Sequence, residues 1–289
     1  ILHFGKFTFT PGVRHEYITF KRFDFGSDDL ERVGEGEPRS NTALVLLPGA
    51  GLNYTLFESL DAFVGVHRGF IPPGSSPDTE PETSINTELG LRYSSNSLSA
   101  QMVLFNNDYE NLLGADVASS GGTGSGDLFN GGSALAKGLE LEIAYDPFAD
   151  GPFDHLAMPT RIGYTYTDAQ FTSTFDSDFG AWGEVEVGDR LPYLAEHQLS
   201  FITSFEVKKI AVDVSARYTS SMRTIAGQGD FIDSESTDAT TILDAGFRYT
   251  LSDSFTISVG ATNLLDGTYI VSSRPYGLRP NMPRAIKFG

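Results

Sequence analysis

"IAVDVSARYT", residues 210–219, alternates between two kinds of side chain at every position. The first set is apolar and consists of Ile210, Val212, Val214, Ala216 and Tyr218. The second set is mostly polar and consists of Ala211, Asp213, Ser215, Arg217 and Thr219. Successive side chains of a β-strand point to opposite faces of the sheet. The stretch therefore predicts a strand with one apolar face and one polar face.

The same period of two residues recurs along the chain, and helical periodicity is nearly absent. It is clear at residues 85–93, 139–145, 243–251 and 255–262. In all, the pattern predicts twelve strands, at 4–24, 42–55, 60–70, 82–94, 97–113, 134–147, 158–171, 193–206, 208–222, 240–251, 254–270 and 283–289. The sequence therefore predicts an all-β protein.

Charge and composition exclude several classes of function. Lys and Arg number 20 against 38 Asp and Glu, which gives a net charge of −18. Nucleic-acid binding requires a dense basic cluster, and the sequence has none, so we expect no nucleic-acid partner. The 289 residues include no cysteine, which removes disulfides, zinc–thiolate sites and cysteine nucleophiles.

Sequence motifs of enzymes are also missing. The five histidines are scattered without the spacing of metal ligands, and neither G-x-S-x-G nor H-E-x-x-H occurs. The glycine-rich GGTGSG at 121–126 lacks the Lys-Ser/Thr of a phosphate-binding loop. We therefore expect no catalytic residue, no metal site and no cofactor in this chain.

The lengths of the connections distinguish a membrane barrel from a soluble β-sandwich, because strands alternate in both. Short joints at 95–96, 207–208 and 251–254 alternate with long connections at 26–42, 113–134, 172–192 and 222–240, apart from a longer joint at 146–158. Outer-membrane barrels have this asymmetry of short periplasmic turns and long extracellular loops. Aromatic residues also gather near the predicted strand ends, where interfacial girdles lie: Tyr54, Phe57, Phe70, Phe105, Tyr109, Tyr145, Phe148, Tyr166 and Phe171. The sequence thus predicts a transmembrane antiparallel β-barrel.

Several segments resemble the barrel of TonB-dependent outer-membrane receptors. Near the carboxyl end the relevant residues are Asn263, Leu264, Leu265, Asp266, Tyr269, Gly277, Arg279, Pro283 and Arg284. Further similar segments are FTPGVRHEY at 9–17, DAFVGVHRGFIPPG at 61–74 and AKGLELEIAYDP at 136–147. LPYLAEHQLS at 191–200, SSMRTIAGQG at 220–229 and YIVSSRPYGLRPNMPR at 269–284 are most similar to the ferric-dicitrate receptors of that family.

The resemblance implies more than this chain contains. Members of the family have a barrel of 22 strands, a plug domain inside it, and a short box that engages an energy-coupling protein of the inner membrane. The twelve segments match the carboxyl-terminal half of such a barrel, so we expect residues 1–289 to be a partial barrel domain without the plug. Residues 1–10 read as a strand, so we expect any signal peptide to lie upstream or to have been removed. The last strand stops short of the family's usual end, so we expect a fragment, or the ordered part, of a receptor.

The implied function is energy-coupled uptake of a ferric-citrate-like chelate across the outer membrane of a Gram-negative bacterium. Such a chelate is an anion, and the arginine fork suits carboxylates. The candidate ligand residues are therefore the arginines and one glutamine at loop edges: Arg68, Arg190, Arg223, Gln228, Arg274 and Arg279. The alternative is that these arginines pair with nearby carboxylates, such as Asp230, Asp233 and Glu235, and only shape the loops.

Charges within the strands are expected on the face that points into the barrel, because charge on the lipid face is costly. They are Glu88, Arg92, Glu140, Glu142, Asp213, Arg217, Asp244 and Arg248. Other functions remain open from the sequence: a passive channel without a plug, an outer-membrane hydrolase, a soluble sandwich, or a receptor for haem, cobalamin or a sugar. The expected partners are the ferric chelate, outer-membrane lipid and, through the plug, the inner-membrane energy-coupling protein.

Overall fold

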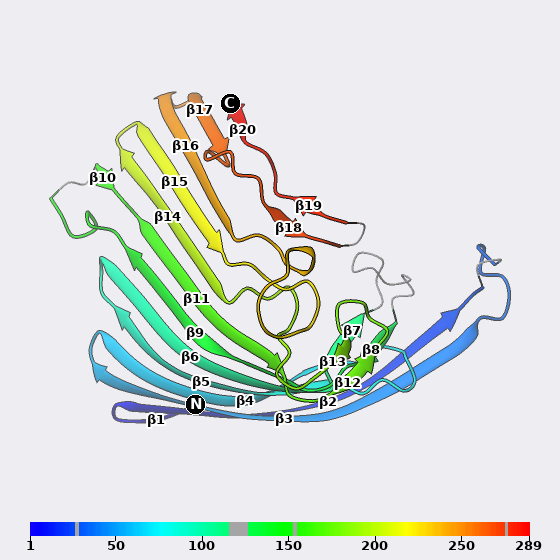
Figure 1. Ribbon diagram of the computed structural model, residues 1–289. Helices are drawn as coiled ribbons and strands as arrows, with labels where there is room; N and C mark the ends of the chain where they lie inside the picture. The colour runs from blue at the N-terminus through cyan, green and yellow to red at the C-terminus, as the bar shows by residue number, and fades with distance from the viewer. Residues whose placement is uncertain (27–28, 116–126, 153–154, 275–276) are drawn as a thin grey trace.

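The computed structural model describes residues 1–26, 29–115, 127–152, 155–274 and 277–289. These residues form one antiparallel sheet of 14 strands that is curved like a trough (Figure 1). The sheet runs in the order β1 (Leu2–Phe4), β2 (Phe7–Asp24), β3 (Glu37–Phe57), β4 (Leu60–Ile71), β5 (Glu82–Ser94), β6 (Leu98–Glu110), β9 (Ala134–Tyr145), β11 (Thr160–Phe171), β14 (His197–Val207), β15 (Ile210–Thr219), β16 (Thr240–Ser252), β17 (Phe255–Thr262) and β20 (Ala285–Phe288), with β10 (Leu156–Ala157) paired to β14. Strands that are adjacent in this order pair antiparallel, so the sheet is a meander of hairpins.

The remaining short elements lie in the long connections. They form three two-stranded sheets, which pair β7 (Leu113–Ala115) with β8 (Leu128–Asn130), β12 (Phe175–Ser177) with β13 (Gly183–Val185), and β18 (Ile270–Ser272) with β19 (Arg279–Pro280). One turn of 3-10 helix, η2, spans Asp233–Glu235. In the described part of the chain, no helix is long and apolar enough to cross a membrane.

Each of the twelve predicted segments contains a strand of the large sheet, and the boundaries differ most at three places. The segment 4–24 is split by a turn at Gly5, where φ is +60°, so β1 and β2 form a hairpin. The connection predicted at 26–42 is shorter, because β3 begins at Glu37 and pairs with Asp24 of β2. The segment 254–270 ends as a strand at Thr262, since the next residue, Asn263, has a φ of +51°.

The connections confirm the predicted asymmetry. Tight turns at 5–6, 58–59, 95–97, 208–209 and 253–254 lie at one end of the sheet, which we call the turn end, together with the longer joint at 146–159. Long loops at 25–36, 72–81, 111–133, 172–196, 220–239 and 263–284 lie at the other end, the loop end. The buried apolar cluster belongs to the loop end as well, since it consists of Ala134, Phe171 and Val185.

The two faces of the sheet differ as the alternation predicts. Leu104 of β6 pairs with Leu89 of β5 and with Leu139 of β9, so the three side chains share the convex face. Leu89 is 55% exposed and Leu104 is 48% exposed, which is unusual for leucine in a water-soluble fold. A sheet that leaves a broad apolar face uncovered requires another apolar surface against it, and lipid supplies one.

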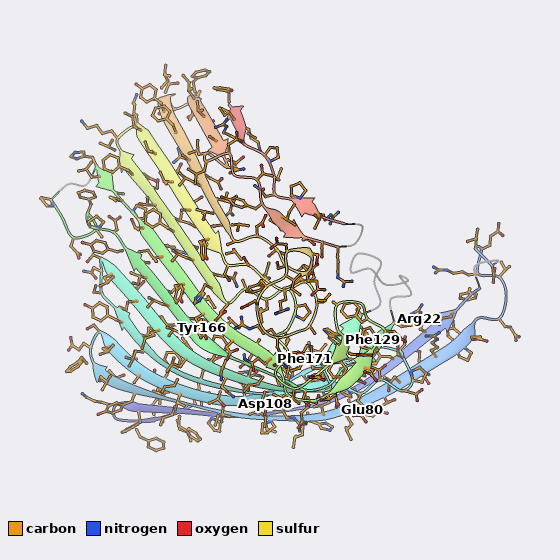
Figure 2. All side chains as sticks on the ribbon, viewed as in Figure 1. Arg22, Glu80, Asp108, Phe129, Tyr166 and Phe171 are labelled. Carbon is orange, nitrogen blue, oxygen red and sulfur yellow. The ribbon has the colours of Figure 1, made fainter. Side chains whose placement is uncertain are left out.

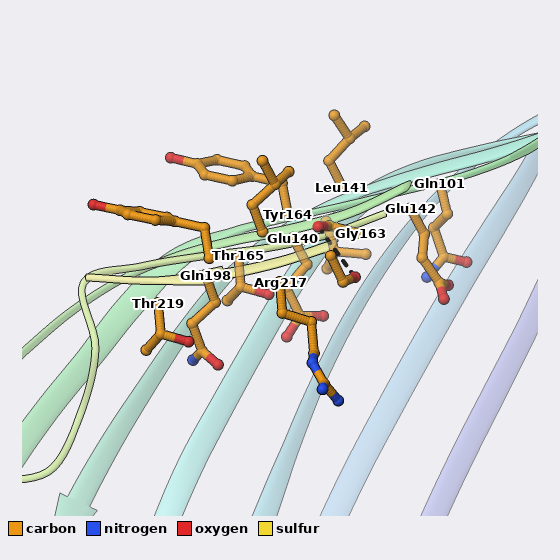
Figure 3. Close-up of a pocket in the computed structure, with 14 residues that line it drawn as sticks. Gln101, Glu140, Leu141, Glu142, Gly163, Tyr164, Thr165, Gln198, Arg217 and Thr219 are labelled. Atoms are coloured by element: carbon orange, nitrogen blue, oxygen red, sulfur yellow. Dashed lines mark hydrogen bonds between the residues drawn. The ribbon is translucent and has the colours of Figure 1, made fainter. Parts of the chain in front are cut away.

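The concave face carries the charges of the strands. The pairing of the strands places Glu88, Arg92, Glu140, Glu142, Asp213, Arg217, Asp244 and Arg248 together on this face, which confirms the prediction that they share the inward side. Figure 3 shows Glu140, Glu142 and Arg217 projecting to one side of the sheet, and Leu141 and Tyr164 to the other.

A charge on the convex face should destabilise the membrane-inserted protein, whereas the same charge on the concave face should be tolerated. Leu89→Arg should lower the free energy of unfolding by about 2–4 kcal/mol, because the guanidinium would enter the hydrocarbon. Glu88→Arg, one residue away on β5, is the matched control and should change it far less. Denaturant titration of the intact protein in lipid vesicles measures both values, and equal losses would contradict a lipid-facing convex side.

Candidate functional site

Three loops pack against one another at the loop end. They are residues 172–196 between β11 and β14, 220–239 between β15 and β16, and 263–284 between β17 and β20. The Ala226 N–H donates to the Ala181 carbonyl at 2.9 Å, and the Asp238 N–H donates to the Ile270 carbonyl at 2.8 Å. The three loops therefore form one assembly, which we call the three-loop cluster.

Arg223 is the most deeply buried of the predicted ligand residues, with 4% of its surface exposed. Its guanidinium donates to the carbonyl oxygens of Gln228, Gly229 and Asp230, the last two at 2.8 and 2.9 Å. The guanidinium carbon also lies 5.6 Å from the centre of the Phe231 ring. Arg223 thus holds the shape of its own loop from within, and its donors serve carbonyl groups rather than the carboxylates expected from the sequence.

Gln228 and Arg190 lie where the first two loops of the cluster meet. The exposed Gln228 donates through Nε2 to the Val187 carbonyl at 3.1 Å. The Arg190 N–H donates to the Gly227 carbonyl at 3.0 Å, and its guanidinium pairs with Glu196 at 2.8 Å. The Arg190 side chain is 41% exposed, so its remaining donors can still reach solvent or a solute.

The third loop carries the other two predicted arginines of the cluster. The Arg274 guanidinium donates to the carbonyl of Gly180 in the first loop. Arg279 lies in β19 opposite Ser272 of β18, and it is exposed. The third loop therefore places one arginine against the first loop and a second one toward solvent.

Arg68 lies apart from the cluster. It pairs with Ile85 of β5, which is 56% exposed on the convex face. The preceding residue with the same orientation is Val66, so the alternation Val64, Val66, Arg68 already indicates this face. The structure thus places five predicted ligand residues in the three-loop cluster and the sixth, Arg68, on the opposite side of the sheet.

An aromatic cluster joins loop 172–196 to loop 111–133, and the sequence analysis did not identify it. The Trp182 ring lies 5.6 Å from Phe129 and 5.9 Å from Phe171, both edge to face. Phe129 and Phe171 are labelled among the gathered loops in Figure 2. Phe171 was predicted in an interfacial girdle, but it is 1% exposed inside this cluster, so that prediction is wrong. Phe105 and Tyr109 were also assigned to the girdle, and both line a cavity on the concave face instead.

Two adjoining cavities follow the concave wall. One, of about 500 Å³, lies between the strands and Leu191 and Leu194 of loop 172–196. The other, of about 470 Å³, is lined by Glu140, Glu142 and Arg217 together with glutamine, serine and threonine side chains (Figure 3). A wall of this composition accommodates a polar, hydrated solute, because it offers hydrogen-bond donors and acceptors along its length. No group of three or more His, Asp or Glu side chains is placed to hold a metal ion in the described ranges.

Glu82 is a buried carboxyl group at the loop end of β5. It is 6% exposed, and its Oε2 accepts a hydrogen bond from the Leu113 N–H at 2.8 Å. At this level the convex face carries the polar Thr83 and Glu110 beside the aromatic Phe70, so Glu82 lies at the interfacial, loop-end edge of the apolar band. Burial raises the pKa of Glu82, and the Leu113 N–H opposes this shift to a smaller extent.

The attachment of loop 111–133 at Glu82 should weaken as the pH rises. Because the folded-state pKa is raised, the attachment is strongest below the ordinary glutamate pKa of about 4.3 and is lost as the pH rises through the raised value. Glu82→Gln keeps the acceptor for Leu113 without the buried charge, so it should abolish this dependence. Hydrogen-exchange protection factors of residues 112–115 in the intact receptor measure the effect, and the same pH dependence in both proteins would contradict it.

Known proteins share this architecture. Residues 2–264 match the family described as TonB dependent receptor-like, beta-barrel. The vitamin B12 transporter BtuB of Vibrio vulnificus (strain YJ016) is 22% identical over 246 residues, which is 85% of this chain and 34% of BtuB. The chain therefore spans about a third of the length of that relative.

Solved structures of receptors have the same fold. The ferric citrate transporter FecA in its unliganded form has a TM-score of 0.72 at 19% identity, covering 99% of this chain and 42% of FecA. The siderophore receptor PiuA from Acinetobacter baumannii has a TM-score of 0.74 at 16% identity, covering 98% of this chain and 40% of PiuA. The ferric-catecholate import receptor Fiu from E. coli K12 in its closed form has a TM-score of 0.69 at 20% identity, covering 99% of this chain and 42% of Fiu.

These similarities show the fold and not the ligand, since a citrate transporter and a catecholate receptor have similar TM-scores against this chain. The match to the family covers most of the chain and includes the apolar convex face, the charged concave face and most of the long loops. The chain belongs to the TonB-dependent receptor family, as part of the β-barrel that its members place in the outer membrane of Gram-negative bacteria.

Proposed function

We propose that this chain is part of a receptor that captures a ferric chelate of the citrate type and imports it into the periplasm. The chelate binds at the three-loop cluster, which closes the outer end of the concave wall. Energy reaches the receptor from an inner-membrane protein through a plug domain, which lies outside these residues. The barrel itself makes and breaks no covalent bond.

The observation that carries this proposal is that five predicted ligand residues from three separate loops, Arg190, Arg223, Gln228, Arg274 and Arg279, come together in one cluster. The cluster also contains Arg284, which pairs with Asp266, and its loops carry eleven Asp and Glu residues, so the proposal rests on these individual donors and not on a net positive charge. A citrate complex of iron presents carboxylate oxygens, and guanidinium groups donate paired hydrogen bonds to such oxygens. The acidic wall beneath the cluster does not compete for the anion, so the ligand is held at the outer end.

The donors differ in how directly they serve the ligand. Arg279 and Gln228 are exposed and form the contacts in this proposal. Arg190 already pairs with Glu196, and Arg274 already bonds the Gly180 carbonyl, so each shares its guanidinium between the loops and the ligand. Arg223 contributes by shaping the loop that holds Gln228, and Arg68 is not included because it lies on the convex face.

Removing the two exposed donors should weaken ferric citrate binding. Arg279→Ala and Gln228→Ala should each lower the affinity about tenfold, since each removes a hydrogen bond to a charged group. Arg248→Ala is the matched control for Arg279→Ala, because Arg248 lies on the concave face near the turn end and its loss changes the net charge by the same amount. Equilibrium titration of the full-length receptor in detergent gives the affinities.

Unchanged affinity in both variants would contradict the assignment of these residues. Titration with cobalamin in parallel tests the other ligand class, because the named relative is a vitamin B12 transporter. Cobalamin binding in the absence of ferric citrate binding would replace the proposed ligand and leave the receptor class intact.

A plugged receptor and a passive channel differ in conductance. In planar bilayers the native full-length protein should be nearly silent, because a plug blocks the lumen of such a barrel. Steady single-channel currents at low voltage would contradict energy-coupled uptake and support a passive channel.

A further inference from the structure

We infer that Tyr193 is a positioning residue that makes the three loops of the three-loop cluster move as one unit. The inference about loop motion does not depend on the identity of the ligand, whereas the effect on ligand capture rests on the proposed function. In the arrangement described here, Tyr193 holds the second loop through its backbone and the third loop through its hydroxyl group.

Two hydrogen bonds define this role. The Tyr193 N–H donates to the carbonyl of Arg223 in the second loop at 2.8 Å. The Tyr193 hydroxyl lies 3.0 Å from the Ser273 hydroxyl in the third loop, within hydrogen-bonding distance. One residue of the first loop therefore bonds to both of the other loops.

The backbone of Tyr193 indicates that these contacts hold it in place. Its φ is +58°, in the left-handed region that is unfavourable for a residue with a Cβ atom. A tyrosine remains in this conformation only when its surroundings fix it. The conformation directs its N–H and its ring toward different loops, which is the geometry that a link between them requires.

The link continues from Tyr193 to a proposed ligand contact. Arg223 accepts the Tyr193 N–H with its carbonyl, and its guanidinium binds the carbonyl oxygens of the turn at 228–230. Gln228 in that turn donates back to Val187 in the first loop at 3.1 Å. These contacts form a closed circuit between the first two loops, and the Tyr193 hydroxyl ties this circuit to the third loop, which carries Arg279.

Three separate sequence segments converge at this point. Tyr193 belongs to LPYLAEHQLS, Arg223 to SSMRTIAGQG and Ser273 to YIVSSRPYGLRPNMPR. From the sequence these segments were linked only by their similarity to one receptor group. Their common contact with Tyr193 gives them a shared structural role, which is to hold the loops in a single arrangement before the ligand arrives.

Tyr193→Phe tests the inference without disturbing the backbone, because it removes only the hydroxyl group. In the ligand-free, full-length receptor, amide exchange should accelerate about fivefold in all three loops, which is the effect of one lost hydrogen bond of about 1 kcal/mol. Ser273→Ala should have the same effect, and the double variant should add nothing, since both changes remove the same bond. Ser273→Thr keeps the hydroxyl and should exchange like the unsubstituted protein.

Tyr164→Phe is the matched control. It also removes a hydroxyl that is hydrogen-bonded, in this case to His197 at 2.9 Å on the convex face, and it should leave exchange in the three loops unchanged. Faster exchange confined to the third loop, or in none of the loops, would overturn the inference whatever the ligand is.

Ligand binding separates a positioning role from a purely structural one. Tyr193→Phe should weaken ferric citrate binding about threefold, and it should have no further effect when Arg279 is already alanine, because the hydroxyl holds the loop that carries Arg279. The same loss in both backgrounds would overturn the positioning role. If all three loops exchange faster but the parent protein does not bind ferric citrate, the link at Tyr193 stands and the proposed ligand is wrong.

Discussion

Backbone hydrogen bonding in a bilayer is the constraint on which this structure depends. Inside lipid, a strand satisfies its N–H and C=O groups only by pairing with neighbouring strands. The meander of antiparallel hairpins meets this requirement, and it leaves one side of each strand for lipid and the other for the barrel interior. Apolar side chains therefore stay uncovered on the convex face, and in the described part of the chain the compact buried cluster lies at the loop end, at Ala134, Phe171 and Val185.

The loops obey a different rule, because they lie in water and contain only short two-stranded ladders. Their polar groups form contacts within and between loops, and arginine side chains supply several of these contacts. Arg223 binds three carbonyl groups, Arg274 binds another, and Arg190 pairs with Glu196. The two roles considered for these arginines, ligand binding and loop shaping, are therefore compatible. A guanidinium group has five N–H donors and can divide them between a ligand and the loop.

The sequence predicted the features that repeat with a local period. Alternation located every strand of the predicted set and the face of every listed strand charge, because a period of two is visible within a few residues. The alternation also indicates that Arg68 lies on the convex face, because Arg68 continues the series of Val64 and Val66. The contacts of Tyr193 with Arg223 and Ser273, and of Trp182 with Phe129, could not be read in this way, because these partners lie far away in the sequence and follow no period. The early start of β3 was hidden for a related reason: the charge of Arg39 on this strand is balanced by Asp24 on the paired strand and by Asp127, and neither partner follows from the local pattern around Arg39.

In the proposed function, the division between regular strands and irregular loops also sets how the ligand is captured. Ordering flexible loops at the moment of binding costs free energy, and a site assembled beforehand avoids much of that cost. The three-loop cluster is assembled through its own hydrogen bonds, and loop 172–196 is anchored further by the rings around Trp182. The rigid strands fix the positions at which the loops begin and end. Contacts between the loops fix which side chains point to solvent. In this proposal, the exposed Arg279 and Gln228 meet the anion without first reorganising the groups behind them.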